Sequence, residues 1–288
     1  MRIGDAIGKN GPVFSFEFFP PKTPQGERNL YQAIERLRPL RPTFVSVTYG
    51  AGGTTREKTV ELVRRIKHEI GIEAMAHLTC TGVDRDEIEQ ILWRLEEAGI
   101  ENVLALRGDP PRDQPLFGRP ANGFAYAAEL VSFIRALGFD FSLGGAGYPE
   151  GHIECPDRDQ DLAHLKHKVD CGLDFVITQL FFDNADYFAF VERAWARGVR
   201  VPIIPGIMPI TNLSQIERFT SMCGARIPDE LRERLGRVRD CDGAVRAIGI
   251  EHATLQCREL LASGAPGIHF YTLNQSPATR AIFEQLRG

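Results

Sequence analysis

The sequence predicts an α/β protein whose strands and helices alternate to form a closed (β/α)₈ barrel, also called a TIM barrel. Short β-branched or aromatic runs begin near residues 13, 43, 73, 102, 139, 174, 201 and 266, with room for a helix between each pair. Helical periodicity occupies these intervals, as in Ile88, Ile91, Leu92 and Leu95. Polar residues stand at the carboxyl ends of several strands, which is typical of the functional face of a barrel.

The predicted helices are bounded by capping signals. Thr23 and Ser276 each precede a proline at the first helical position, and Thr54 and Glu57 have the spacing of a capping box. Glycines suited to end helices follow at positions 71, 99, 138, 172 and 198. These signals divide the chain into repeated βα units.

The longest interval lies between the seventh and eighth predicted strands. It contains a segment at 212–223, a polar stretch at 226–239 and a predicted helix at 241–262. We therefore expect an extra helical insertion before the eighth strand. Since no low-complexity linker interrupts the chain, residues 1–288 are expected to form a single barrel domain.

An open, doubly wound sheet is the alternative architecture. Its usual fingerprint, G-x-G-x-x-G, is completed neither by G-A-G-G-T-T at 50–55 nor by G-A-G-Y-P-E at 145–150, and no Walker A sequence occurs. Nucleotide binding of the Rossmann type is therefore not expected.

Composition limits the classes of partner. The 288 residues carry a formal net charge of -4 without any Lys/Arg run, which argues against nucleic-acid or membrane surfaces and favours a small-molecule partner. The start lacks an apolar signal region, and no stretch approaches about 18 apolar residues, so we expect a cytoplasmic protein. Six scattered cysteines without a C-x-x-C pair indicate free thiols and no metal site.

Glu17 is the first candidate for chemistry. In F-S-F-E-F-F at 14–19, alternation places Ser15, Glu17 and Phe19 on one face of the strand. A carboxyl group among phenylalanines is desolvated, which favours its protonated form and suits a general acid near neutral pH. The alternative is a glutamate paired with a charge on a neighbouring strand.

Two further strands carry candidate polar residues. Asp109 follows Arg107 at a strand exit and either forms an ordinary ion pair there or directs its charge at a ligand. His77 lies in an otherwise apolar strand, where a buried core histidine and a ligand contact are both open interpretations. No second histidine or cysteine accompanies it at metal spacing.

Asp161, His164 and Lys168 form a polar stripe on one predicted helix. The stripe is either a solvated face or, because its helix begins after the loop at 148–152, a phosphate-binding surface. Gln179 lies inside a hydrophobic strand and is there either for ligand recognition or to satisfy core groups.

The most specific signal is a series of motifs along almost the whole chain. They are S-F-E-F-F-P-P at 15–21, V-S-V-T-Y-G-A at 45–51, A-H-L-T at 76–79, L-A-L-R-G-D-P at 104–110, Y-P-E-G-H at 148–152, L-K-H-K-V-D-C-G at 165–172, I-T-Q-L-F-F-D at 177–183, P-G-I-M-P at 205–209 and H-F-Y-T-L-N at 269–274. In this order they resemble methylenetetrahydrofolate reductases, flavin-dependent (β/α)₈ enzymes of one-carbon metabolism and methionine biosynthesis.

The resemblance implies that FAD lies across the carboxyl face of the barrel. The flavin contacts it implies are Thr48, His77, Arg107, Gly108, Asp109, Tyr126, Ala127, Tyr148, His152, Asp161, His164, His167 and Lys168. Asp109 would lie near the pyrimidine edge of the flavin, where a fixed negative charge disfavours the anionic reduced form and tunes the potential.

The resemblance also implies a reaction. Glu17 would be the general acid that protonates N10 of 5,10-methylenetetrahydrofolate and opens its ring to a 5-iminium cation, which hydride from reduced flavin converts to 5-methyltetrahydrofolate. NADH or NADPH would re-reduce the flavin in a ping-pong cycle on the same face. The substrate contacts implied are Glu17, Gln179, Gln215, Phe219, Tyr271 and Gln275.

Three positions depart from the family pattern. Gln275 stands where a cation often meets the folate glutamate, so weaker binding of the folate tail is expected. His164 and His167 replace an amide and an arginine, which would make flavin retention weaker or dependent on pH.

The resemblance carries two expectations about organisation. Because the sequence stops at Gly288, soon after the eighth unit, we expect a bacterial-type barrel without the carboxyl-terminal domain that eukaryotic members use to sense S-adenosylmethionine. We also expect a homo-oligomer, since family members are dimers or tetramers.

Two other functions stay open. One is a barrel that binds flavin or folate without turnover, against which the acidic residues Glu17 and Asp109 argue, because binding alone needs no buried acid. The other is a barrel lyase acting through Glu17 and His77, which a purified protein without yellow cofactor would favour.

Overall fold

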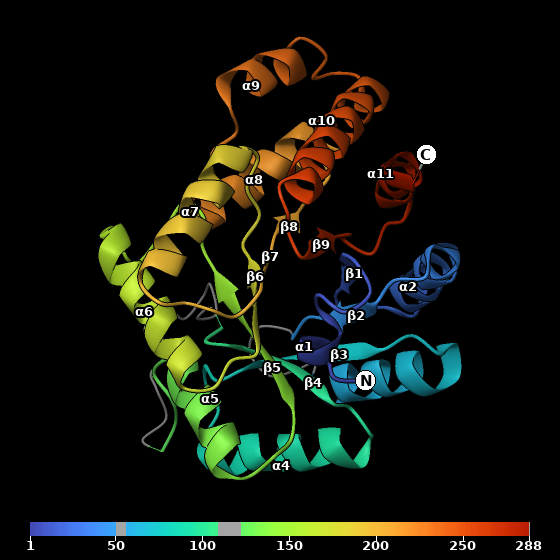
Figure 1. Ribbon diagram of the computed structural model, residues 1–288. Helices are drawn as coiled ribbons and strands as arrows, with labels where there is room; N and C mark the ends of the chain where they lie inside the picture. The colour runs from blue at the N-terminus through green and yellow to red at the C-terminus, as the bar shows by residue number, and fades with distance from the viewer. Residues whose placement is uncertain (50–55, 109–121, 288) are drawn as a thin grey trace.

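Figure 1 shows the computed structural model, in which helices surround a ring of parallel strands. The structure describes residues 1–49, 56–108 and 122–287. Its strands are β1 (Val13–Phe18), β2 (Phe44–Val47), β3 (Ala74–Thr79), β4 (Asn102–Leu106), β5 (Ser142–Gly147), β6 (Phe175–Thr178), β7 (Ile203–Ile204), β8 (Gly206–Ile207) and β9 (Gly267–Tyr271). Its helices are α1 (Ile3–Ala6), α2 (Pro24–Leu37), α3 (Arg56–Arg65), α4 (Arg85–Glu97), α5 (Ala127–Ala136), α6 (Arg158–Asp170), α7 (Asn184–Ala196), α8 (Leu213–Cys223), α9 (Asp229–Gly236), α10 (Asp242–Ala262) and α11 (Pro277–Arg287).

The strands follow the order β7-β6-β5-β4-β3-β2-β1-β9-β8, and all pairs are parallel. The two end strands are halves of one segment, because only Pro205 separates β7 from β8. β7 pairs with β6 and β8 pairs with β9, so this segment joins the two edges of the sheet. The (β/α)₈ barrel predicted from the sequence is confirmed.

The predicted boundaries hold with one shift. Thr23 caps α2 by accepting a hydrogen bond from the backbone of Gly26 at 3.1 Å, as expected. The predicted capping box at 54–57 lies partly outside the described residues. The fifth strand begins at Ser142 and not near 139, because Phe139 and Phe141 pack on each other with ring centroids 5.3 Å apart before the strand starts. That aromatic run indicated burial and not strand pairing.

The side chains of β1 divide the core into two layers. Phe16 and Phe18 point outward into the large cluster between strands and helices. A second cluster fills the barrel interior and consists of Ile3, Val13, Phe44, Met75, Leu104, Phe175, Ile177 and Ile204. Because side chains alternate along a strand, Ser15 and Glu17 lie on the inward side with Val13.

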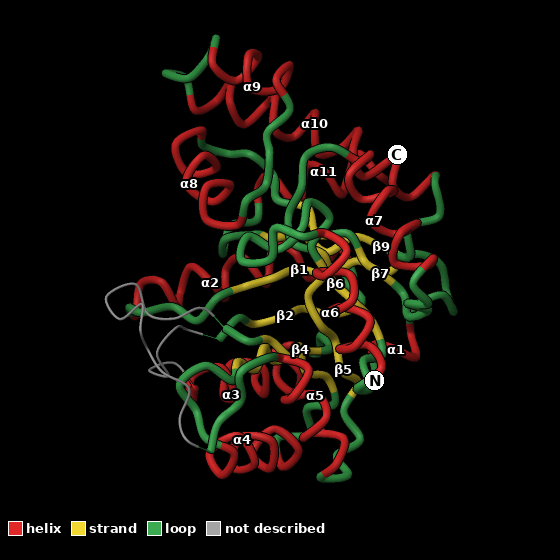
Figure 2. The backbone as a smooth tube through the Cα atoms, turned by 90° about the vertical axis from the view of Figure 1, so that its left-hand side faces the viewer, coloured by secondary structure: helices red, strands yellow, loops and turns green. Residues whose placement is uncertain are grey.

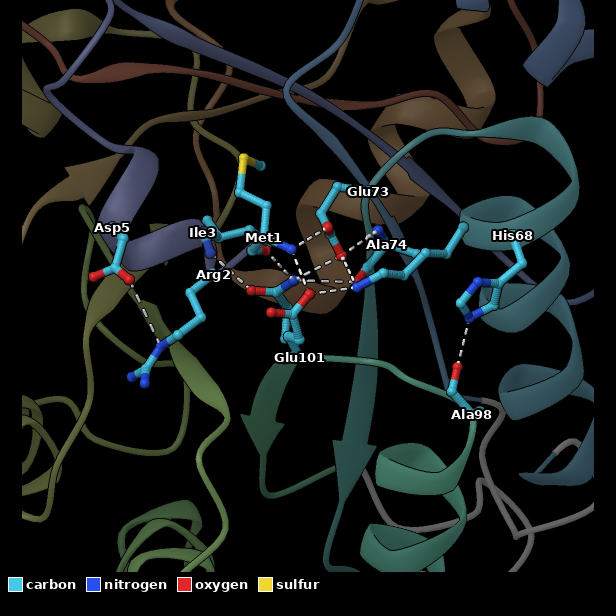
Figure 3. A network of polar contacts seen from close by, with 11 residues as sticks. Met1, Arg2, Ile3, Asp5, His68, Glu73, Ala74, Ala98 and Glu101 are labelled. Carbon is cyan, nitrogen blue, oxygen red and sulfur yellow. Dashed lines mark hydrogen bonds and ion pairs between the residues drawn. The ribbon is translucent and has the colours of Figure 1, made fainter.

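The amino end of the barrel is closed by α1. Its Ile3 is fully buried inside the barrel, and its backbone N–H donates to Oδ1 of Asn102 at 2.8 Å. The amide of Asn102 donates in turn to the carbonyl of Met1 and to Glu73, at 3.0 and 3.1 Å. The amino group of Met1 and the ammonium of Lys67 both pair with Glu73, which completes the network shown in Figure 3.

The predicted insertion before the last strand is present as α8, α9 and α10. Figure 2 shows α8 and α9 standing together at one end of the molecule, with α10 beside them. A separate cluster that includes Leu180, Met208 and Leu231 packs this insertion against the chain that follows β6 and β8. The insertion is thereby held over the carboxyl end of the barrel. Among the described residues, no helix is both long and apolar enough to span a lipid bilayer.

Candidate active site

A cavity of about 480 Å³ opens at the carboxyl end of the barrel. This volume lies in the range of small-molecule sites. Its walls come from the ends of the barrel strands, from the loop after β5 and from α8. They include Glu17, Phe19, Thr48, His77, Leu104, Leu106, Arg107, Gly108, Ala146, Tyr148, His152, Glu154, Ile177, Gln179, Met208, Phe219, Met222, Cys223 and Tyr271.

The floor of the cavity holds Glu17 between two imidazoles. Oε2 of Glu17 lies 3.3 Å from Nε2 of His77 on β3 and 3.3 Å from Nε2 of His269 on β9. The Glu17 side chain is 17% exposed, His77 is 7% exposed and His269 is fully buried. The carboxylate therefore lines the cavity with two largely buried imidazoles beside it.

The charge state of Glu17 differs from the expectation. Burial raises its pKa, but the charge of His77 and a hydrogen bond from His269 outweigh that effect and lower the pKa to about 2. The prediction that desolvation alone keeps this carboxyl protonated is wrong, because the sequence did not reveal its two partners. The alternative interpretation, a pairing with neighbouring strands, describes the ligand-free site.

A second polar group crosses the mouth of the cavity. Arg107 donates two hydrogen bonds to the carboxylate of Glu154, at 2.5 and 2.7 Å. Gly108 beside it has a φ of 86°. A Cβ on Gly108 would lie 2.8 Å from Cβ of Thr79, so only glycine fits where the chain turns into the site.

The predicted polar stripe on α6 is half buried at one end. Nζ of Lys168 donates to the carbonyl of Ala146 at 2.6 Å, and burial lowers the Lys168 pKa to about 8. Burial raises the pKa of Asp161, an effect that His152, Lys168 and His164 oppose. His164 and His167 are exposed. The stripe thus continues from the cavity wall at His152 to solvent.

Gln179 and Tyr271 form another part of the cavity wall. The side-chain oxygen of Gln179 accepts from the backbone of Leu180 at 2.9 Å, which holds the amide at the cavity surface. The hydroxyl of Tyr271 donates to the carbonyl of Thr178 at 2.7 Å. Both side chains are therefore positioned before any ligand binds.

Part of the cavity wall is apolar and comes from the insertion. α8 supplies Phe219, Met222 and Cys223, and Phe19 after β1 is 43% exposed at the rim. Met222 is 47% exposed. Large apolar side chains exposed at the edge of a cavity provide surface for a flat or aromatic ligand.

The structure gathers part of the predicted site directly. The cavity is lined by the predicted residues Glu17, Thr48, His77, Arg107, Gly108, Tyr148, His152, Gln179, Phe219 and Tyr271. The predicted residues Tyr126, Ala127, Asp161, His164, His167, Lys168, Gln215 and Gln275 do not line it. Asp109 lies outside the described residues.

Several site residues were not singled out from the sequence. His269 begins the motif H-F-Y-T-L-N, and its position two residues before Tyr271 was the available signal for an inward-facing side chain. Glu154, the partner of Arg107, lies in a loop, and Met222 lies one helical turn after Phe219. Neither carried a signal of its own.

Comparison with known proteins identifies a family. A family model described as methylenetetrahydrofolate reductase matches residues 2–287. Methylenetetrahydrofolate reductase (NADH) 1 of Arabidopsis thaliana is 43% identical over 295 residues, which cover 99% of this chain and 50% of the plant protein. The 5,10-methylenetetrahydrofolate reductase of Escherichia coli K12 is 39% identical over 272 residues, which cover 94% of this chain and 90% of the bacterial protein. This chain spans about half the length of its plant relative.

Solved structures share the architecture. A Clostridium thermocellum protein that binds two copies of 5-methyl-5,6,7,8-tetrahydrofolic acid matches with a TM-score of 0.66 and 15% identity, over 96% of this chain and 94% of that protein. The aldo-keto reductase Tm1743 matches with a TM-score of 0.55 and 12% identity, over 98% of this chain and 93% of that protein. Identities this low establish the common fold only.

Proposed function

The chain belongs to the methylenetetrahydrofolate reductase family, and from this premise we propose that it reduces 5,10-methylenetetrahydrofolate to 5-methyltetrahydrofolate with electrons from NADH or NADPH, by way of bound FAD. The observation that carries the proposal is the placement of Glu17. This carboxylate is mostly buried, faces the cavity at the carboxyl end of the barrel and touches two imidazoles. A site that only binds flavin or folate has no need of such a group.

In the proposed reaction, Glu17 transfers a proton to N10 of the folate. The protonated carboxyl donates to N10 of the folate while the bond between N10 and the methylene carbon breaks and its electron pair goes to N10. The ring opens, and the same folate molecule becomes a 5-iminium cation. Because the ligand-free carboxyl is ionised, the site has to supply this proton when the folate binds.

A buried polar atom and an apolar surface in the cavity fit a flavin. Nε2 of His77 is buried and makes no hydrogen bond of good geometry within the described parts of the chain, so it suits a polar edge of a ligand. The apolar floor formed by Leu104, Leu106, Ala146 and Ile177 suits a flat ring. Thr48, His77, Arg107, Tyr148 and His152 would hold the ring region, with Asp161 and Lys168 on α6 beyond it.

When bound, FAD supplies the redox chemistry, taking up hydride from NAD(P)H and returning it to the methylene carbon of the folate. The chain's own residues orient the partners. Gln179 presents its amide from one wall, and the apolar side chains of α8, including Phe219, exclude water and pack on the substrate ring. One cavity for both substrates requires that they bind in turn, as in a ping-pong cycle.

The test is a spectrum of the purified protein in visible light. A flavin band that bleaches when NADH or NADPH is added without oxygen, and returns on addition of methylenetetrahydrofolate, would establish both half-reactions. The Glu17→Gln variant is the matched control and should bleach without recovery. A protein that stays colourless after incubation with FAD would overturn the proposal and favour the barrel lyase instead.

A further inference from the structure

His269 is a buried polar residue inside the barrel to which the proposed mechanism gives no role. It is fully buried on β9, where the strand register aligns it with Ser15 of β1. Its Nδ1 lies 2.7 Å from the hydroxyl oxygen of Ser15, and its Nε2 lies 3.3 Å from Oε2 of Glu17. Phe44 stacks on one side of its ring, with ring centroids 6.3 Å apart. Each nitrogen of His269 therefore has one defined partner.

The partner at Nδ1 suits two protonation states. When His269 is neutral and donates from Nε2 to the Glu17 carboxylate, Nδ1 is an acceptor and the Ser15 hydroxyl donates to it. When the pair holds one more proton, Nδ1 becomes a donor and the same hydroxyl accepts. Among the side chains that can meet an imidazole, a hydroxyl is one that satisfies both states after a simple rotation. A carbonyl or a carboxylate at this place would favour only the second state.

We infer that His269, oriented by Ser15, is a positioning residue that holds the proton which Glu17 delivers to the folate. The inference rests on the proposed function. The proton moves from Nε2 of His269 to Oε2 of Glu17, and from there to N10 as the bond between N10 and the methylene carbon breaks. No oxidant or reductant takes part in these transfers. The pair regains one proton per turnover from the cavity, through the exposed edge of Glu17.

Other groups face Glu17 and set the balance of charge. His77 approaches the same oxygen from β3, and Tyr271 lies on β9 in register with Glu17. The Tyr271 ring meets the His269 ring edge to face, with centroids 5.3 Å apart. Its hydroxyl is engaged with the carbonyl of Thr178, so it is not a proton source for Glu17. His77 faces the cavity and the proposed flavin, whereas the ring nitrogens of His269 contact only Ser15 and Glu17 among the described residues.

Two variants and one matched control test this inference. His269→Gln keeps a donor near the position of Nε2 but cannot take up a proton. Ser15→Ala removes only the hydroxyl that serves both states. Ser46→Ala removes an equally buried serine hydroxyl from β2, which has no hydrogen-bond partner within the described residues, and it should behave as the unmodified protein.

The measurement separates the half-reactions of the FAD-loaded protein across pH 5.5 to 8.5. His269→Gln should slow the reoxidation of reduced flavin by methylenetetrahydrofolate about 10- to 100-fold at pH 7. Reduction by NAD(P)H should stay within about 2-fold, since it needs no proton from Glu17. Ser15→Ala should shift the pH profile of the folate half-reaction to lower pH by about one unit, because its protonated imidazole loses an acceptor.

A second readout does not depend on activity. Carbon-13 spectra of labelled glutamate in the ligand-free protein report the ionisation of Glu17, whose resonance is assigned with Glu17→Gln. Because the charge of His269 lowers the Glu17 pKa and a glutamine amide carries no charge, His269→Gln should move the Glu17 midpoint to higher pH. An unchanged midpoint together with an unchanged pH profile would overturn the inference, as would an equal loss of both half-reactions.

The outcomes also distinguish this inference from the proposed function. If NAD(P)H reduces the flavin of the unmodified protein but the folate never reoxidises it, the proposed function is wrong. The carbon-13 midpoint would still show whether His269 controls the ionisation of Glu17. If His269→Gln does not fold, Ser15→Ala tests the inference, since that substitution changes little side-chain volume. An unchanged pH profile and an unchanged carbon-13 midpoint of Glu17 in Ser15→Ala would then overturn it.

Discussion

The two ends of the barrel use buried polar groups in opposite ways. At the amino end, the side chain of Asn102 accepts from Ile3 and donates to Met1 and Glu73. At the carboxyl end, Nε2 of His77 makes no hydrogen bond of good geometry within the described residues, although a carboxylate lies 3.3 Å away. One network closes the barrel and the other leaves polar atoms facing a cavity.

The amino end of the barrel thus contributes stability, and the carboxyl end keeps polar groups available to a ligand. A fully satisfied buried network holds its members in one arrangement, and removal of any member exposes an unpaired group. Groups left without a partner cost stability unless a ligand completes them. We therefore expect substitutions at the amino end to change the free energy of unfolding, and substitutions at the carboxyl end to change binding and turnover.

The largest expected effect tests the carboxyl end. Glu17→Gln should lower the rate of the folate half-reaction about 10²- to 10⁴-fold, the usual contribution of a general acid, and leave flavin reduction by NAD(P)H nearly unchanged. Stopped-flow absorbance of each half-reaction measures both. Equal loss of the two rates would mean that Glu17 shapes the site without donating a proton.

The next effect tests the amino end. Asn102→Ala removes the side-chain acceptor of the Ile3 backbone N–H and the amide that donates to Met1 and Glu73, so the free energy of unfolding should fall by about 2–4 kcal/mol. Urea denaturation measures this value, and turnover per folded molecule should be unchanged. Asn29→Ala on the exposed face of α2 is the control. A large loss of activity at full stability would break the division between the two ends.

A pH-dependent effect is expected at Glu150, which follows β5 at the carboxyl end. Burial raises its pKa to about 7, while a hydrogen bond from the backbone of Arg226 opposes the shift. A raised folded pKa means that the stability present below the unfolded value is lost as pH rises through about 7. Allowing for its partial exposure, Glu150→Gln should add about 1 kcal/mol at pH 8.

The control for this effect is the same variant at low pH. Near pH 4, both the folded and the unfolded protein carry a largely protonated Glu150, so the substitution should change little there. Thermal melts across the pH range provide the measurement. An equal gain at both pH values would indicate that packing and not ionisation is responsible.

The smallest effect on stability is expected at Glu154. Its side chain is 55% exposed, so the pair with Arg107 should contribute less than about 1 kcal/mol to folding. Glu154→Gln removes the carboxylate charge that faces the Arg107 guanidinium, so FAD should bind a few-fold more tightly in a fluorescence titration of flavin-free protein. Weaker binding would show instead that Glu154 holds Arg107 in the orientation that the flavin requires.

The repeated spacing of β-branched runs and the glycines after each helix were enough to predict the barrel and the insertion before the last strand. These signals are local, since periodicity and capping depend on neighbours in sequence. Alternation along β1 also placed Ser15 and Glu17 on the face opposite Phe16 and Phe18, and the structure turns that face toward the barrel interior. The motifs predicted the family, which the match over residues 2–287 supports.

Only the tertiary structure decided the chemical state of that inward face. Ser15 and His269 are 254 positions apart, and they meet because β1 and β9 are adjacent in the closed ring. The same closure brings His77 and His269 to Glu17 and reverses the pKa shift expected from burial alone. Local sequence determines which way a side chain points, but its partners depend on strand order and register, and these partners set its charge.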